Sequence, residues 1–208
     1  MPRTQRDLRE ACIAEGMAII ASDGLEKLSL REVARRLGVS HQAPYRHFES
    51  RDHILAEMVS RAFDAFADFL DRHPASDSPD EDMANMARDY LLYARERPLE
   101  YRLMFGTPLP DGALFPEMMA KAKHAFSLLV SGLERKARLS GIRRDAEELQ
   151  LDALVIWSSL HGLAAVKSSS VVTTLGLDDL LMARSDEHMI RGFSAFLTAP
   201  LGSSTAID

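Results

Sequence analysis

Polar side chains able to read a DNA base sequence gather in one short stretch near the start of the chain. His41, Gln42, Tyr45 and Arg46 offer an imidazole, a primary amide, a phenol and a guanidinium. A glutamine amide can form two hydrogen bonds with adenine, and an arginine guanidinium can bind guanine or a phosphate. The imidazole and the phenol suit base edges, thymine methyl groups or phosphates. We therefore expect this stretch to contact DNA.

Hydroxyl groups and cations flank the stretch where helices are expected to begin. Such groups suit phosphate oxygens at the positive end of a helix. Each single residue can also be an ordinary solvated side chain, so the prediction concerns the group. The complete set that we predict to contact DNA is Ser29, Arg31, Ser40, His41, Gln42, Ala43, Tyr45, Arg46, His47 and Arg51.

A short helix is expected immediately before this stretch. Ser29 precedes the apolar-periodic segment 30–37, and Glu32 follows the serine by three residues, as in a capping box. Gly38 then stands where a left-handed C-terminal cap is expected. The polar residues of the segment face outward in this arrangement, among them Arg31, Arg35 and Arg36.

A second short helix is expected over residues 41–48. Ser40 stands at its N-terminal cap, and Pro44 falls in the first turn, where a missing backbone N–H does not break a long ladder. Phe48 is expected in the core. Two short helices joined by a three-residue turn that contains glycine form a helix-turn-helix, so we predict one at residues 29–48 whose second helix can enter a major groove.

The chain as a whole has helical periodicity, and no run of residues alternates in the two-residue period of a half-buried strand. We predict an all-α protein with an N-terminal three-helix helix-turn-helix DNA-binding domain and a C-terminal helical ligand-binding and dimerisation domain. The expected domains are residues 1–50 and 51–200, followed by a tail at 201–208. Asp145 with Glu148 is expected to cap a long helix. The other helices expected after residue 50 are 51–72, 79–97, 98–106, 116–139, 146–168, 177–183 and 186–197, with a loop at 168–176.

The charge distribution permits DNA binding without favouring it strongly. The formal net charge is −6, but residues 1–60 hold nine Arg or Lys and nine Asp or Glu, so the acidic excess lies after residue 60. Since the phosphate backbone attracts cations, this neutral segment predicts a modest electrostatic contribution to binding.

Several classes of protein are disfavoured by what the sequence lacks. We expect no membrane span or secretory signal, and the single cysteine, Cys12, suits a reducing compartment, so a cytoplasmic location is predicted. No protease, hydrolase, P-loop or dinucleotide motif occurs, and His and carboxylate residues show no compact metal spacing. The prediction is therefore a non-enzyme with no catalytic residues, no metal and no cofactor.

Residues 23–55, DGLEKLSLREVARRLGVSHQAPYRHFESRDHIL, resemble the DNA-binding domain of the tetracycline-repressor (TetR) family of bacterial regulators. The family usually has lysine where this chain has Arg51, which keeps the charge that would reach a phosphate. The resemblance implies a dimeric transcription regulator with a ligand-sensing C-terminal domain. Its matching marks are Gly24, Ser29-Leu30-Arg31, Val33-Ala34, Leu37-Gly38-Val39-Ser40, Tyr45, His47-Phe48 and Ser50-Arg51.

A second resemblance covers the C-terminal part. Trp157-x-x-x-His161-Gly162, preceded by Arg97-Pro98-x-x-Tyr101-x-x-Met104-Phe105, is similar to the TetR subgroup named for its Trp-His-Gly (WHG) residues. Methionine and aromatic side chains provide adaptable apolar lining for a small-molecule effector, although such stripes are also typical of an ordinary core. His161 can line the pocket or satisfy a buried carbonyl. The predicted ligand-binding residues are Phe63, Phe66, Met86, Tyr90, Met104, Phe105, Met119, Trp157 and His161.

Helix-turn-helix regulators commonly act as two-fold dimers on palindromic double-stranded operators. By family resemblance, the homodimer would form through helices 146–168 and 186–198. We hypothesise a repressor that a small, mostly apolar molecule releases from its operator through a shift of helix 51–72. The residues leave two alternatives open: a ligand-requiring activator, and an interaction module that has the same fold but does not bind DNA. Small residues that would permit close approach of the dimer helices are Ala153, Ser158, Gly162, Ala164, Ala165, Gly192 and Ala195.

Overall fold

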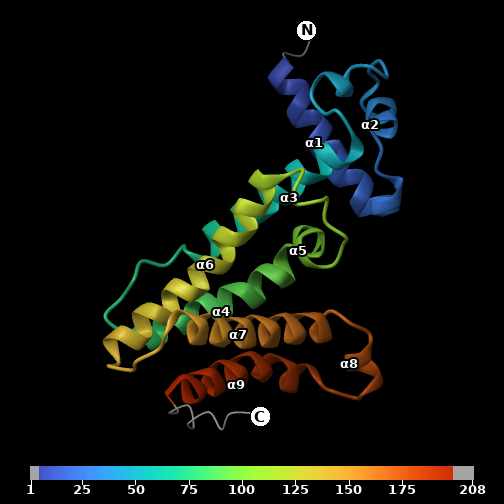
Figure 1. Ribbon diagram of the computed structural model, residues 1–208. Helices are drawn as coiled ribbons and strands as arrows, with labels where there is room; N and C mark the ends of the chain where they lie inside the picture. The colour runs from blue at the N-terminus through green and yellow to red at the C-terminus, as the bar shows by residue number, and fades with distance from the viewer. Residues whose placement is uncertain (1–4, 199–208) are drawn as a thin grey trace, which may run out of the picture. The chain divides into compact units, whose positions relative to one another are not determined.

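Helices make up the regular structure, which confirms the predicted all-α class. The computed structural model describes residues 5–198, and this range contains no β-strand. The predicted tail at 201–208 lies outside the described residues. Two 3₁₀ turns, η1 (Leu25–Lys27) and η2 (Pro44–Arg46), lie on either side of α2 in the chain. The α-helices are α1 (Gln5–Asp23), α2 (Leu30–Leu37), α3 (Arg51–Leu70), α4 (Pro79–Glu96), α5 (Pro98–Phe105), α6 (Pro116–Leu139), α7 (Ala146–Lys167), α8 (Val171–Thr174) and α9 (Asp179–Thr198) (Figure 1).

The described helices pack into two compact units. Unit 1 consists of the chain up to Phe66 together with Pro98–Ala125, and unit 2 consists of Ala67–Arg97 together with the chain from Phe126. Helices α3 and α6 each continue from one unit into the other. This division follows packing, so the functional boundary after residue 50 stays a prediction.

Unit 1 is built around α1, which packs against α2 and both 3₁₀ turns. Cys12 and Ile19 of α1 are fully buried, and Phe48 is only 1% exposed. At Gly16, a Cβ atom would lie 3.3 Å from both Sδ and Cε of Met58, so glycine permits a close approach of α3. The core of unit 1 therefore holds the short helix α2 and its neighbouring turns in place.

Unit 2 is built around α7, which packs against α4 and α9. Helices α7 and α9 run side by side in Figure 1. The buried apolar residues of α7 recur at intervals of three or four and thus form one stripe of the helix. They are Leu149, Ala153, Ile156, Leu160 and Ala164.

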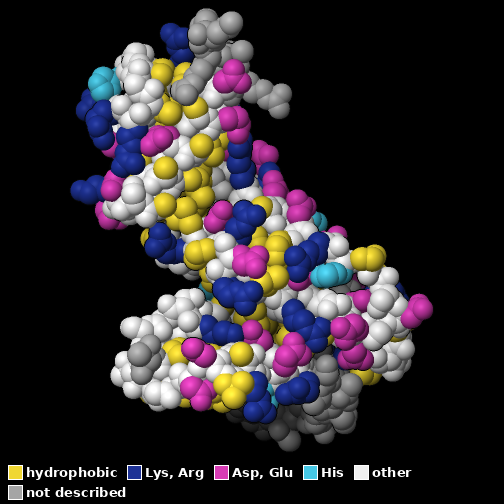
Figure 2. Space-filling view, turned by 180° about the vertical axis from the view of Figure 1, so that it is seen from behind, with side chains coloured by type: hydrophobic (Ala, Val, Ile, Leu, Met, Phe, Trp, Pro, Cys, Tyr) yellow, Lys and Arg dark blue, Asp and Glu magenta, His cyan; other side chains and the backbone are white. Residues whose placement is uncertain are grey.

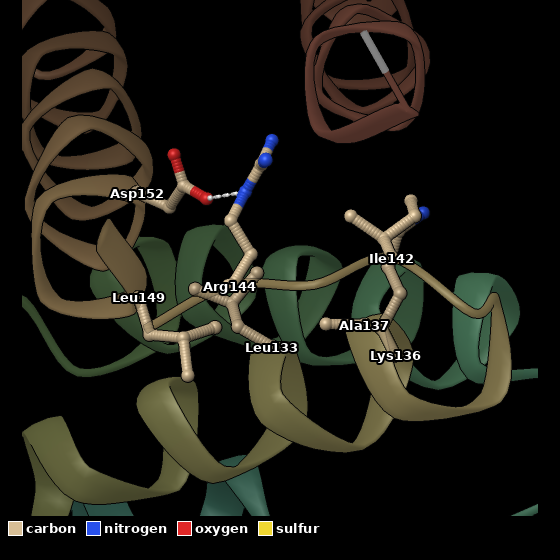
Figure 3. A pocket seen from close by; sticks show the side chains of 7 residues that line it. All are labelled: Leu133, Lys136, Ala137, Ile142, Arg144, Leu149 and Asp152. Atoms are coloured by element: carbon tan, nitrogen blue, oxygen red, sulfur yellow. Dashed lines mark hydrogen bonds and ion pairs between the residues drawn. The ribbon is translucent and has the colours of Figure 1, made fainter. Parts of the chain in front are cut away.

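Charged groups that are buried in unit 2 have ionic partners. Asp89 accepts a hydrogen bond from Nε of Arg72 over 3.0 Å. Nε of Arg144 donates to Asp152 over 3.3 Å, where the chain passes from α6 to α7 (Figure 3). The hollow beside this pair measures about 10 Å³, room for about one water molecule. We therefore do not assign it to an effector.

The start of α7 matches the predicted cap. A carboxylate oxygen of Asp145 accepts a hydrogen bond from the backbone N–H of Glu148 over 2.9 Å, and the N–H of Asp145 donates to the Glu148 carboxylate over 2.8 Å. This reciprocal pair is a capping box.

The last helices differ from the prediction. Helix α8 occupies part of the stretch 168–176 that was expected to be a loop. The helices expected at 177–183 and 186–197 are replaced by one continuous helix, α9, which begins at Asp179. Ser185 lies at the break that was expected between these two segments. Its hydroxyl donates to the carbonyl of Met182 over 2.7 Å, so the serine is satisfied within a continuous helix.

The capping box gives the first testable prediction. Asp145→Ala removes the carboxylate that accepts from the N–H of Glu148, leaves the backbone N–H of residue 145 in place, and should lower the free energy of unfolding by about 1 kcal/mol. Urea denaturation followed by circular dichroism measures this loss. Asp145→Ser keeps an acceptor at the same position and should retain most of the stability. An alanine variant as stable as the wild type would contradict the capping role.

Candidate nucleic-acid interface

Helix α2 is the first helix of the predicted helix-turn-helix, and it begins and ends where the sequence indicates. The hydroxyl oxygen of Ser29 accepts a hydrogen bond from the backbone N–H of Glu32 over 3.1 Å. Gly38 closes the helix with a φ of 66°, in the left-handed region that favours glycine. The apolar side of α2 is buried against α1, so the opposite side, with Arg31, is exposed.

Residues 41–48 do not form the predicted second α-helix. They form successive turns that include η2. The N–H of Ala43 bonds to the carbonyl of Ser40 over 2.9 Å, and the N–H of His47 bonds to the carbonyl of Pro44 over 3.0 Å. These bonds span three residues, not four. Because Pro44 has no N–H to donate, the ladder of an α-helix is interrupted at this point.

Four of the ten predicted DNA-contacting residues share one open hollow on the surface of unit 1. Arg31 of α2 lines it together with His41, Gln42 and Tyr45 of the following turns, and its volume is about 400 Å³. All four residues are exposed, and 45% of Tyr45 is accessible to solvent. Donors from two elements therefore converge on one accessible concavity, which can accept the edge of a polar, anionic partner.

The remaining predicted residues have different environments. Ser40 and Arg46 are exposed, whereas Ala43 is half-buried. His47 is also half-buried, and its Nε2 atom is enclosed without a hydrogen-bond partner among the described residues. The Ser29 oxygen accepts the capping bond described above, so only its hydroxyl hydrogen is left for another acceptor.

Arg51 holds the backbone of unit 1. Its Nε donates to the carbonyl of Leu28 over 3.1 Å, and its Nη2 donates to the carbonyl of Leu25 over 2.9 Å. The remaining Nη1 lies 3.4 Å from the carboxylate of Asp52. The sequence predicts that the guanidinium of Arg51 contacts phosphate. In the structure, this guanidinium connects the start of α3 to the backbone carbonyls of the segment that leads into α2.

Phe48 anchors the turns to the core. Its ring meets His53 of α3 edge to face, with ring centres 6.3 Å apart, and the guanidinium carbon of Arg9 lies 5.4 Å from the ring centre. His53 in turn meets Phe115 at 5.9 Å. The turns that carry the exposed His41, Gln42 and Tyr45 are therefore followed by a buried aromatic side chain that fixes the end of their segment.

Glu32, which the sequence indicates only as part of the cap of α2, binds two arginines of the same helix. Its carboxylate accepts hydrogen bonds from Arg35 over 2.6 and 2.8 Å and from Arg36 over 3.0 Å. Hydrogen bonds from Arg35 and then Arg36 lower the pKa of Glu32 to about 2. Spacings of three and four residues on a helix place such side chains together, so this signal was present in the sequence.

Few Arg and Lys side chains of this region lack an ion pair and could bind DNA phosphates. Figure 2 shows Lys and Arg side chains beside Asp and Glu side chains at the end that carries α1 and α2. Arg9, Arg35 and Arg36 are all paired with carboxylates. Among Arg and Lys of residues 7–50, those without an ion pair are Lys27, Arg31 and Arg46.

The predicted effector residues lie in both units. In unit 1, Phe105 of α5 meets Phe63 and Phe66 of α3, each edge to face with ring centres 5.8 Å apart. Met104 is 3% exposed, and Met119 packs against Gly112. Tyr101, 5.0 Å from the Phe105 ring, joins this cluster. It was absent from our predicted set, although its spacing of four residues from Phe105 on one helix is a usable signal.

A second cluster lies in unit 2. The hydroxyl of Tyr90 lies 3.4 Å from Nδ1 of His161, and the rings of Trp157 and His161 are 6.2 Å apart. Phe126 of α6, which we did not predict, stands 6.1 Å from Trp157. Met86, the remaining predicted residue of this unit, lies near Gly132. This cluster combines aromatic surface with a polar pair.

Two family models match this chain. Residues 13–58 match the bacterial regulatory proteins of the tetR family, and residues 83–192 match the tetracyclin repressor-like C-terminal domain. The chain belongs to the TetR family. TetR-family proteins are transcriptional regulators, not enzymes, that bind DNA operators, respond to small-molecule effectors and dimerise.

Individual relatives agree with this assignment. The HTH-type transcriptional regulator Rv0681 of Mycobacterium tuberculosis is 26% identical over 170 residues, which are 82% of this TetR-family chain and 74% of that protein. The structure of the regulatory protein SCO4313 has a TM-score of 0.71 and 27% identity and covers 96% of this chain and 100% of its own. The SmeT–triclosan complex, at 18% identity and a TM-score of 0.59, covers 96% of this chain and 98% of its own and shares the fold.

The role of Arg51 leads to a prediction about stability. Arg51→Ala leaves the carbonyls of Leu25 and Leu28 without their side-chain donor and should lower the free energy of unfolding by about 1–3 kcal/mol. Arg31→Ala serves as a control, since that exposed arginine has no ion pair and its loss should change stability by less than about 0.5 kcal/mol. Thermal and urea unfolding of both variants measure the difference. Equal stability of the two variants would contradict this role of Arg51.

Proposed function

We propose that this TetR-family regulator reads a palindromic operator with the exposed residues around the hollow of unit 1 and acts as a repressor. The observation that carries the proposal is the convergence of Arg31, His41, Gln42 and Tyr45 on one open concavity. Gln42 can pair with adenine, and Arg31 and Arg46 can bind phosphates or guanine. Ser29, Ser40 and His47 lie within two residues of these side chains in the sequence and can bind phosphate oxygens. Because operator DNA is cytoplasmic in bacteria, the regulator acts there.

The effector of this repressor is a small, mostly apolar molecule. Phe63, Phe66 and Phe105 supply aromatic surface in unit 1, and Trp157 supplies it in unit 2. The Tyr90–His161 pair offers a hydrogen-bonding group that can orient such a ligand. The SmeT relative, solved with triclosan, supports the idea that this fold can hold a small molecule.

The subgroup of the family is the one named for Trp-His-Gly. Trp157, His161 and Gly162 form the motif, and the first two lie one helical turn apart on α7 with ring centres separated by 6.2 Å. The hydroxyl of Tyr90 on α4, in the same unit, lies 3.4 Å from Nδ1 of His161. This placement supports a role of the motif in sensing.

Helix α3 transmits effector binding to the DNA-reading surface of the repressor. It begins at Arg51, which holds the carbonyls before α2, and continues to Phe63 and Phe66 of the aromatic cluster. A ligand that favours one position of α3 would thereby change the placement of the DNA-reading surface. Such coupling requires that the ligand bind the two arrangements with different affinity.

The homodimer forms through α7 and α9. Helix α7 has a second apolar stripe that is exposed in the single chain, with Leu151 at 56%, Leu154 at 46% and Val155 at 47%. Ala153 and Ala164, which we expected at this interface, are buried within the protomer. Ser158, Gly162, Ala165 and Gly192 are exposed, whereas the side chain of Ala195 lies outside the described residues.

The same stripe explains why α7 is, among the described residues, the one helix long and apolar enough to cross a membrane by composition. Only 33% of its apolar window is buried within the protomer. A helix that is buried on one side by its own chain and on the other by a partner must be apolar on both sides. We assign the exposed stripe to the partner subunit, with no membrane involved.

The DNA-binding role is tested by titrating the protein with duplexes of its own upstream intergenic sequence across a salt series. If Arg31 and Arg46 each neutralise one phosphate, a dimer engages about four, and log K should fall with log salt with a slope of about −4. Arg46→Ala should reduce this slope by about 2 per dimer. Gln42→Ala should leave the slope unchanged and cost about 1–3 kcal/mol of preference for the operator.

Lys27→Ala is the matched control for this titration, because Lys27 is an unpaired cation outside the predicted surface. Its affinity and slope should equal those of the wild type. An affinity for the duplex that does not change with salt, or binding that is retained in both the Gln42→Ala and the Tyr45→Ala variants, would overturn the proposed surface. Binding only in the presence of a ligand would identify an activator.

The dimer is tested by sedimentation of Val155→Asp, which places a charge within the exposed stripe of α7. Burying an unpaired carboxylate in an apolar interface is strongly unfavourable, so this variant should be monomeric at concentrations where the wild type is dimeric. Leu114→Asp, at an apolar residue that is 73% exposed in unit 1, should stay dimeric. A dimeric Val155→Asp would exclude the assigned interface.

A further inference from the structure

Glu32 holds an exposed arginine on the DNA-facing side of α2. Nε and Nη2 of Arg35 donate to the two carboxylate oxygens of Glu32 over 2.8 and 2.6 Å. Two parallel bonds of this kind fix both the position and the charge of a guanidinium. The arginine is nonetheless at the surface, with 66% of its side chain exposed.

Arg35 lies on the same face of α2 as a residue of the proposed DNA surface. It follows Arg31 by four residues, and residues four apart are neighbours on one side of a helix. Arg31 lines the hollow that also contains Gln42 and Tyr45. A released Arg35 guanidinium would therefore stand beside the surface at which phosphates arrive.

Arg36 is held differently, and Glu32 is not its only partner. Its guanidinium also pairs with Asp23 and lies 3.6 Å from a carboxylate oxygen of Glu15. Loss of Glu32 would leave Arg36 in contact with these two carboxylates. Arg35, by contrast, has Glu32 as its one ion-pair partner among the described residues.

We propose that Glu32 determines the DNA specificity of this regulator by occupying Arg35, which would otherwise bind phosphates of any sequence. A phosphate contact adds affinity for all DNA equally and carries no information about bases. Neutralising Arg35 keeps binding to random DNA weak, so the residues around the hollow contribute a larger share of the total affinity. The inference rests on the proposed function, because it assumes that this surface meets DNA.

The test compares Glu32→Gln with Glu26→Gln by titration with a duplex of random sequence and with the upstream intergenic duplex. Glu26 is exposed and has no ion pair among the described residues, so its variant makes the same change in net charge without releasing an arginine. Backbone capping is retained in Glu32→Gln, because Ser29 binds the backbone N–H of residue 32. Thermal unfolding and sedimentation confirm that each variant is folded and dimeric.

We expect Glu32→Gln to bind the random duplex several times more tightly than Glu26→Gln at moderate salt. One added phosphate contact per protomer, two per dimer, should steepen the slope of log K against log salt by about 1.8. The ratio of operator affinity to random-duplex affinity should fall. Arg35→Gln should have little effect alone but should reverse the gain when combined with Glu32→Gln.

Two results would overturn the inference while the proposed function stands. Glu32→Gln could behave like Glu26→Gln on both duplexes, or Arg35→Gln could weaken binding as much in the wild type as in the Glu32→Gln background. Failure of the proposed function has a different signature, since the wild type and Glu32→Gln would then bind neither duplex.

Discussion

A surface that reads DNA must expose its polar side chains while its backbone remains fixed, and in this chain hydrogen bonds to the backbone around α2 satisfy that requirement. Ser29 occupies the N–H of Glu32 at one end of the helix, and the left-handed Gly38 closes the other. Arg51 supplies donors to the carbonyls of Leu25 and Leu28. Because these groups are satisfied locally, the outward side of α2 and the turns after it need not contribute packing and can carry Arg31, Gln42 and Tyr45.

The second constraint is electrostatic. DNA attracts cations without regard to sequence, so a regulator gains specificity when few of its cations are free to meet phosphate. Residues 1–60 are neutral overall, and much of this neutrality is local: Arg9 of α1 and Arg35 and Arg36 of α2 are paired with carboxylates, whereas Arg31 of α2 is not. Under the proposed function, base contacts and dimerisation therefore contribute more to operator affinity than the net charge does.

Helix α7 combines three roles along one segment. Its buried stripe forms the core of unit 2, its exposed apolar stripe suits a partner subunit, and Trp157 with His161 contributes to an aromatic cluster that contains a polar pair. Placing these roles on different sides of one long helix allows the contacts of a ligand and those of a partner to bias the same rigid element. Under the proposed function, this arrangement would let α7 link effector binding to dimer assembly.

The amino-acid sequence determined the helical class, the ends of α2 and α7 and the identity of the exposed residues near the hollow. These features depend on local rules: apolar spacing, caps such as Ser29 and Asp145, and the left-handed preference of Gly38. Only the tertiary structure decided which partners the side chains bind and which of them are buried. The Arg51 guanidinium binds carbonyls that lie 23 and 26 residues away in the chain, and Ala153 faces its own core although its size equally suits a dimer. Residues 41–48 depart from helix because a proline lacks one donor. The physical reason is that local hydrogen bonds are encoded by neighbours in sequence, whereas the partner of a long side chain depends on which distant groups folding brings within its reach.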